Sequence, residues 1–220
     1  MHCGELPRFL LKFPPVITGG KQRESKMNKL HNKTFWIAAA LVLLMAATRF
    51  NHFGSAVALP DASYAVFFLA GLFLGRVRGA LALLALLMLE AALVDFYAIN
   101  FREISAYCVT SAYAFLVFAY GALWFVGRWY AAHHAVSGKG VLGLMLAAAV
   151  AGSAAFVIAN VSFYLLAGYF EQMSVWQYIV SVAQYYLPYV AVTMFYVGLV
   201  FAVQVLVQFL GKPQQETDAA

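Results

Sequence analysis

Six long apolar stretches that carry almost no charge are the feature that most constrains how this chain can fold. An apolar run of about 20 residues is long enough to cross the hydrocarbon core of a bilayer as a helix. Charged residues make up only 10% of the chain, against about a quarter in an ordinary soluble domain. We therefore expect an all-α integral membrane protein with six transmembrane helices. The expected spans cover approximately residues 35–53, 62–77, 79–98, 105–127, 141–167 and 178–210.

The distribution of basic residues predicts the orientation of these helices. Seven Lys and Arg precede the first span, four lie in the connections after the second and fourth spans, and Lys212 follows the sixth. On the opposite side we find only Arg49 and Arg102. Because cytoplasmic loops are enriched in Lys and Arg, both termini are expected in the cytoplasm. The net charge of +5 is thus explained by membrane topology, and we expect no nucleic-acid partner.

The two ends of the chain differ from the apolar middle. Residues 1–33 are basic and show no periodic apolar pattern, which predicts a disordered tail. Met27 offers an alternative start of translation. A cleaved signal peptide is disfavoured because Arg49 interrupts the first apolar run. The expected six-helix domain covers residues 34–210, and residues 211–220 form a cytoplasmic C-terminal tail.

Small residues at four-residue spacing predict faces on which helices pack closely. Such stripes allow the backbones of membrane helices to approach each other. They can pack two spans of the same chain, which we favour, or bind a partner. Pro188 within the last span predicts a kink, because it removes one backbone hydrogen bond. The stripes are Gly71 and Gly75 in the second span, and Ala147, Ala151, Ala155 and Ala159 in the fifth.

Polar side chains gather near the outer ends of the expected spans. Polar groups within a membrane are costly and usually mark a functional site. An interfacial belt of aromatic residues is a competing interpretation, but it does not account for Asp95, Asn160 and Gln184. We therefore expect an outward-facing binding cavity. Its expected residues are His52, Asp95, Cys108, Ser111, Asn160, Tyr164, Gln184, Tyr185 and Tyr189.

Glu90 lies in the middle of the third span, on a different face from Asp95. It could be a proton-coupling carboxylate or a buried acid that is hydrogen-bonded within the protein. The residue pattern does not discriminate between these two roles.

Cys108 lies near the outer end of the fourth span. A cysteine within a membrane is most often a small apolar filler, and the two cysteines of this chain do not indicate a disulfide framework. A thiolate is nevertheless a good ligand for a soft metal. One thiolate cannot build a zinc site, but it can take one axial position of a metal that a macrocycle already holds.

Several segments resemble one family of membrane transporters. They are Arg49-Phe50-Asn51-His52-Phe53, Leu59-Pro60-Asp61-Ala62-Ser63, Phe67-Phe68-Leu69-Ala70-Gly71 and the spacing of Asp95, Cys108 and Tyr113. Over approximately residues 30–210 the chain resembles the BtuM family, whose members are solitary cobalamin transporters similar to the S-components of energy-coupling-factor transporters.

This resemblance implies a multi-pass protein of the bacterial inner membrane that takes up cobalamin, vitamin B12, and is a transporter, not an enzyme. In the family a cysteine of the fourth helix coordinates the corrinoid cobalt and can displace cyanide from cyanocobalamin. The matching residue here is Cys108. Asp95 and, by the resemblance alone, Tyr113 match polar positions of the same cobalamin pocket.

Two sequence features bear on the source of energy. The chain contains no Gly-x-x-x-x-Gly-Lys-Ser/Thr motif, so no ATP site of the P-loop type is expected. S-components that use a shared module carry Ala-x-x-x-Ala in the first helix, whereas residues 38–40 are here followed, four positions on, by Val42, Leu43 and Leu44. We therefore expect no obligatory ATPase partner.

Two alternatives remain open on the sequence. The chain could bind another vitamin, with Cys108 inert. It could also be a membrane enzyme in which Cys108 is the nucleophile, His52 the base and Asp95 the residue that orients the base.

Overall fold

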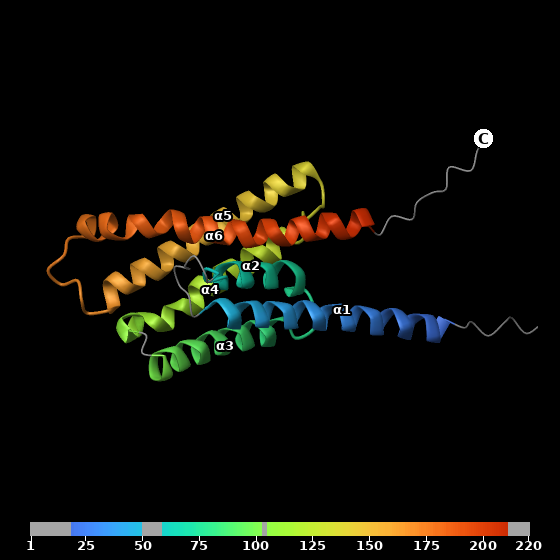
Figure 1. The fold of residues 1–220 in the computed structure, drawn as a ribbon, viewed down its shortest axis with the longest axis horizontal. Coiled ribbons are helices and arrows are strands. Elements are labelled where there is room, and N and C mark those ends of the chain that lie inside the picture. The colour runs from blue at the N-terminus through green and yellow to red at the C-terminus, as the bar shows by residue number, and fades with distance from the viewer. Residues whose placement is uncertain (1–18, 50–58, 103–104, 211–220) are drawn as a thin grey trace, which may run out of the picture. The chain divides into compact units, whose positions relative to one another are not determined.

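The computed structural model describes residues 19–49, 59–102 and 105–210, with side chains from Asn32 onward, and all regular structure in these ranges is helical (Figure 1). The chain divides into residues 1–36 and residues 37–220, and the contacts below all lie within the second unit. The α-helices are α1 (Gly19–Thr48), α2 (Ser63–Leu74), α3 (Ala80–Phe101), α4 (Leu116–Tyr130), α5 (Gly138–Leu166) and α6 (Val175–Leu210), and the short 3₁₀ helices are η1 (Ala106–Cys108) and η2 (Ser111–Phe115).

Four helical segments are long and apolar enough to cross a membrane, which confirms the prediction of an all-α, multi-pass membrane protein. Many Leu, Val and Phe side chains on their outer faces are exposed, as expected where lipid takes the place of water. The four segments are Ala80–Phe101, Ser111–Tyr130, Gly138–Leu166 and Val175–Leu210. The remaining two apolar helices, Asn32–Thr48 and Ser63–Leu74, are shorter.

Helix α2 is a buried core helix. It has 12 residues, about 18 Å at the rise of an α-helix, whereas the hydrocarbon core is about 30 Å thick. It contacts α3, α4, α5 and α6, and all but two of its side chains are buried. The second span, expected over residues 62–77, is thus shorter than predicted and is enclosed by protein, where irregular backbone at its ends is tolerated.

Helices α2 and α4 touch backbone to backbone. A Cβ atom at Gly71 would overlap the carbonyl group of Trp124, and one at Gly127 would overlap the carbonyl oxygen of Phe68. The glycine stripe therefore packs two helices of the same chain, as predicted. On α5, Ala147, Ala151 and Ala155 are buried in the same core.

Helix α1 begins at Gly19, within the stretch that we expected to be disordered. Lys, Gln, Arg, Glu and Met prevail in its first turns, and these residues favour helix even without an apolar face. Residues 1–18 and 211–220 lie outside the described residues. At the other end of the chain, α6 continues through Pro188 without a break.

Candidate functional site

A buried arginine organises the polar end of the bundle. Arg49 directly follows α1 and is only 3% exposed. Its Nε donates to Asp95 Oδ1 over 2.8 Å, and its Nη2 donates to Asp95 Oδ2 over 2.7 Å. Nε also donates to the carbonyl oxygen of Ala91 over 3.1 Å. The planar guanidinium thus binds the carboxylate through two parallel hydrogen bonds, the strongest geometry for such a pair.

The other side of the guanidinium binds α2 and α4. Its Nη1 donates to Ser63 Oγ over 2.8 Å and to the hydroxyl oxygen of Tyr120 over 2.9 Å. The Ser63 hydroxyl in turn donates to Asp61 Oδ1 over 2.5 Å. The Tyr120 ring stacks on Phe67 of α2, with centroids 4.2 Å apart. Arg49 therefore forms hydrogen bonds with three helices, α2, α3 and α4. These hydrogen bonds offset the free-energy cost of burying its charge.

Asp95 and Tyr113, which we expected in a binding cavity, belong to this buried network. The Tyr113 hydroxyl donates to Asp95 Oδ2 over 2.7 Å. Both carboxylate oxygens of Asp95 are therefore engaged by protein, and the side chain is 15% exposed. The pair holds η2 against α3 and so fixes the chain that leads from Cys108 into α4.

Cys108 differs from the sequence prediction, since a continuous helix over residues 105–127 would place it in the first turn. It ends the short helix η1, and α4 begins only at Leu116. Thr110, between η1 and η2, has extended backbone, and its hydroxyl oxygen accepts from the Ala112 N–H over 3.2 Å. Ser105 accepts from the Tyr107 N–H in the same way. Such local side-chain bonds compete with the helix and account for its late start.

The Cys108 thiol is free and exposed. The protein around it nevertheless raises the pKa of the thiol by desolvation, and the negative charge of Asp95 raises this pKa further. Cys108 also interacts electrostatically with Tyr178 and Tyr189 of α6. Cys108 thus lies within electrostatic range of two further predicted site residues, Asp95 and Tyr189.

Aromatic rings lie beside this cysteine. Tyr107, the residue before it, stacks on Tyr169 with centroids 4.6 Å apart and meets Phe163 edge to face. Tyr178 contacts Tyr164 and Phe170, each with centroids 4.8 Å apart. Flat apolar surfaces next to an exposed thiol suit a large planar ligand.

The other predicted residues divide into two groups. Asn160 lies among the rings, where the Tyr178 hydroxyl donates to its backbone oxygen over 3.1 Å. Tyr164 donates to the carbonyl oxygen of Met173, and Tyr189 contacts the rings of Tyr64 and Phe156. In the second group, Ser111, Gln184 and Tyr185 are exposed, and the Gln184 amide donates back to the Ser181 carbonyl over 2.9 Å. His52 lies outside the described residues.

Sequence reasoning placed Arg49 on the outer face but did not assign it to the site. An arginine at the end of an apolar helix is costly to place in a membrane, and this cost could have indicated that Arg49 belongs to the site. Tyr120 was also missed as a site residue, because a tyrosine within an apolar run carries little information about its neighbours.

A protein-only metal site does not form in the part of the chain that the structure describes. No group of three or more His, Cys, Asp and Glu side chains comes together there. Cys108 can therefore bind a metal in this neighbourhood only if the metal brings its other ligands, since one thiolate cannot satisfy a metal ion alone.

Comparison with models of known protein families found no match to this chain, and comparison with curated proteins found none either.

Proposed function

We propose that this chain is a cobalamin uptake protein of the bacterial inner membrane, similar to the BtuM family. In this proposal six helical segments cross or enter the membrane, both termini are cytoplasmic, and cobalamin arrives from the periplasm. The cobalt of the bound vitamin takes Cys108 as an axial ligand. The observation that carries the proposal is an exposed free thiol at Cys108. The preceding residue, Tyr107, stacks on Tyr169, and the following short helix is bonded through Tyr113 to the buried Arg49–Asp95 pair.

A single thiolate is sufficient for a corrinoid. The macrocycle already occupies the equatorial positions of the cobalt, so the protein needs to supply only one soft axial donor. The neighbourhood raises the pKa of the Cys108 thiol, first by desolvation and then by the charge of Asp95. The thiol must therefore be deprotonated by the cobalt itself, as metals do with coordinating thiols.

In this proposal, coordination by Cys108 also removes cyanide from cyanocobalamin. The sulfur of Cys108 donates an electron pair to Co(III) and forms a Co–S bond, while the Co–C bond breaks and cyanide leaves with its electron pair. The thiol proton ends on cyanide, giving hydrogen cyanide. The oxidation state of cobalt does not change, so the exchange requires no reductant.

The surrounding residues have separate roles in this proposal. Tyr107 and Tyr169 cover apolar parts of the corrin ring, and Asn160 and Gln184 bind its peripheral amides. Asp95 and Tyr113 are positioning residues, because their mutual bond holds the segment that carries Cys108. The alternative of a thiol enzyme is less favourable, since Arg49 and Tyr113 occupy the carboxylate that would orient a base and a raised thiol pKa opposes nucleophilic activation.

The test is the absorption spectrum of cyanocobalamin mixed with purified protein. We expect loss of the cyanide-bound spectrum with the parent and with Cys3→Ser, the matched control at the other cysteine of the chain. With Cys108→Ser the spectrum should stay unchanged. Decyanation should accelerate as pH rises toward the raised thiol pKa, because more thiolate is present before cobalt binds. Equal decyanation by Cys108→Ser would refute the role of Cys108.

Uptake is tested in a strain that lacks every other cobalamin importer and all energy-coupling-factor ATPases. With this chain expressed, we expect cobalamin-dependent growth at limiting vitamin. Growth only upon co-expression of an ATPase module would show that transport is not solitary. Absence of growth in both cases, with the protein confirmed in the membrane, would refute transport.

A further inference from the structure

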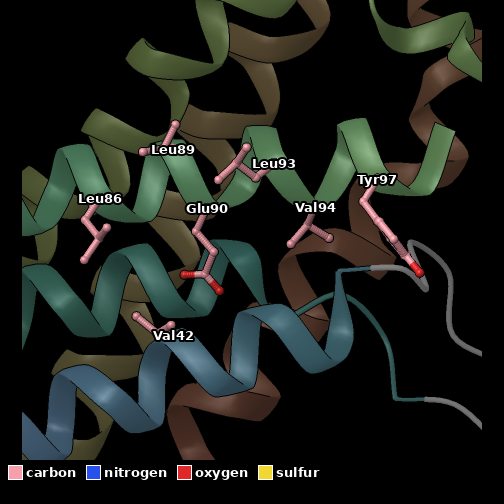
Figure 2. Close-up of a pocket in the computed structure, with 7 residues that line it drawn as sticks. All are labelled: Val42, Leu86, Leu89, Glu90, Leu93, Val94 and Tyr97. Atoms are coloured by element: carbon pink, nitrogen blue, oxygen red, sulfur yellow. The ribbon is translucent and has the colours of Figure 1, made fainter. Parts of the chain in front are cut away.

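A pocket lies in the lateral groove between α1 and α3, and Cys108 is not among its lining residues. Its volume is about 340 Å³. Val42 belongs to α1, and the other lining residues belong to α3 (Figure 2). The lining residues are Val42, Leu86, Leu89, Glu90, Leu93, Val94 and Tyr97.

One carboxyl group is placed within this apolar lining. Glu90 reaches from α3 toward Val42 on the facing helix (Figure 2). Both of its carboxyl oxygens are buried, and neither has a hydrogen-bond partner among the residues that the structure describes. The backbone N–H of Ala46 on α1 lies near them, but inside a helix that group donates to the carbonyl four residues earlier.

Among the described residues, the charges around Glu90 do not balance an ionised carboxylate. Arg49 is the cation that interacts with it, yet the guanidinium is already paired with Asp95 through two hydrogen bonds. On its own helix, the Asp95 carboxylate adds negative charge, and Tyr97 lines the same groove. A carboxylate in such a groove would lose its hydration without an equivalent compensation, whereas the neutral acid loses far less.

We propose that Glu90 is a proton-binding site within the membrane, where the groove holds its side chain as the neutral acid and admits small apolar reagents from the lipid. Proton binding at Glu90 does not depend on cobalamin binding at Cys108. The ligand is the proton, and a lipid-soluble carbodiimide is the probe for it.

The reaction of this probe requires the protonated form. The carboxylic acid transfers its proton to one carbodiimide nitrogen, and the resulting carboxylate oxygen forms a C–O bond with the central carbon. The O-acylisourea then rearranges by moving the acyl group to nitrogen, which gives a stable N-acylurea. No group leaves, and no oxidant or reductant takes part.

The experiment treats the full chain in lipid vesicles with dicyclohexylcarbodiimide and maps the adduct by peptide mass spectrometry. We expect the adduct on Glu90. We also expect labelling to fall as the pH is raised, because the carboxylic acid that reacts is deprotonated. Glu90→Gln should lose it, and Glu171→Gln, which changes an exposed carboxyl between α5 and α6, should retain it. A water-soluble carbodiimide should label Glu171 in preference to Glu90.

Site mapping on the unchanged protein keeps the test valid if Glu90→Gln fails to fold. An adduct found elsewhere but not on Glu90, or Glu90 labelling that increases with pH, would overturn the proposal. Because no cobalamin is present, this outcome is independent of the decyanation result.

Discussion

At the scale of single residues, Arg49 sets the arrangement of the polar end. Its charge is enclosed by Asp95, Ser63 and Tyr120, which come from three different helices. The sequence placed Asp95 in an outward-facing binding cavity, whereas in the structure both of its carboxylate oxygens are bound by Arg49 and Tyr113. It did not identify the partner, because residues 46 positions apart meet only through the tertiary fold.

Asp95→Asn should destabilise the protein strongly. The substitution leaves the buried guanidinium of Arg49 without its counter-charge, and breaking a buried pair in this way costs about 3–5 kcal/mol. Thermal unfolding in detergent micelles measures the loss. The control is the double variant Arg49→Met/Asp95→Leu, which removes both charges and should unfold at a higher temperature than Asp95→Asn. A single variant as stable as the parent would contradict the pairing.

At the scale of elements, the apolar helices were predictable and their exact beginnings were not. Runs of apolar residues located all the long helices, but α4 begins at Leu116 and not near residue 105. Ser105 and Thr110 bind backbone N–H groups locally and divide that stretch into η1 and η2. Hydrophobicity does not detect such competition, so the position of Cys108 in a short connecting helix could not be derived from it.

The contact between α2 and α4 makes a prediction about glycine. In Gly127→Ala the new methyl group would overlap the carbonyl oxygen of Phe68, so the two helices must separate. Overpacking of this kind costs about 1–3 kcal/mol or more. Gly121→Ala is the matched control on the same helix, because a Cβ there meets nothing within 4 Å. Thermal unfolding should show a lower midpoint for Gly127→Ala only, and equal midpoints for the two variants would refute the backbone contact.

At the scale of the whole molecule, four long apolar segments accompany a short helix that protein encloses. The sequence predicted the membrane-spanning character correctly. The sequence could not show that α2 is a buried helix and not a lipid-exposed span, because its apolar residues would fit lipid as well as a protein core. The count of six spans and the cytoplasmic termini stay predictions based on the distribution of Lys and Arg.

The most direct measurement of the central claim is X-ray absorption at the cobalt edge for the protein purified with bound cobalamin. The proposed function predicts one sulfur neighbour of cobalt in the parent and in Cys3→Ser. That neighbour should be absent in Cys108→Ser, where nitrogen or oxygen takes its place. A parent complex in which cobalt has no sulfur neighbour would contradict the assignment of Cys108 as the axial ligand.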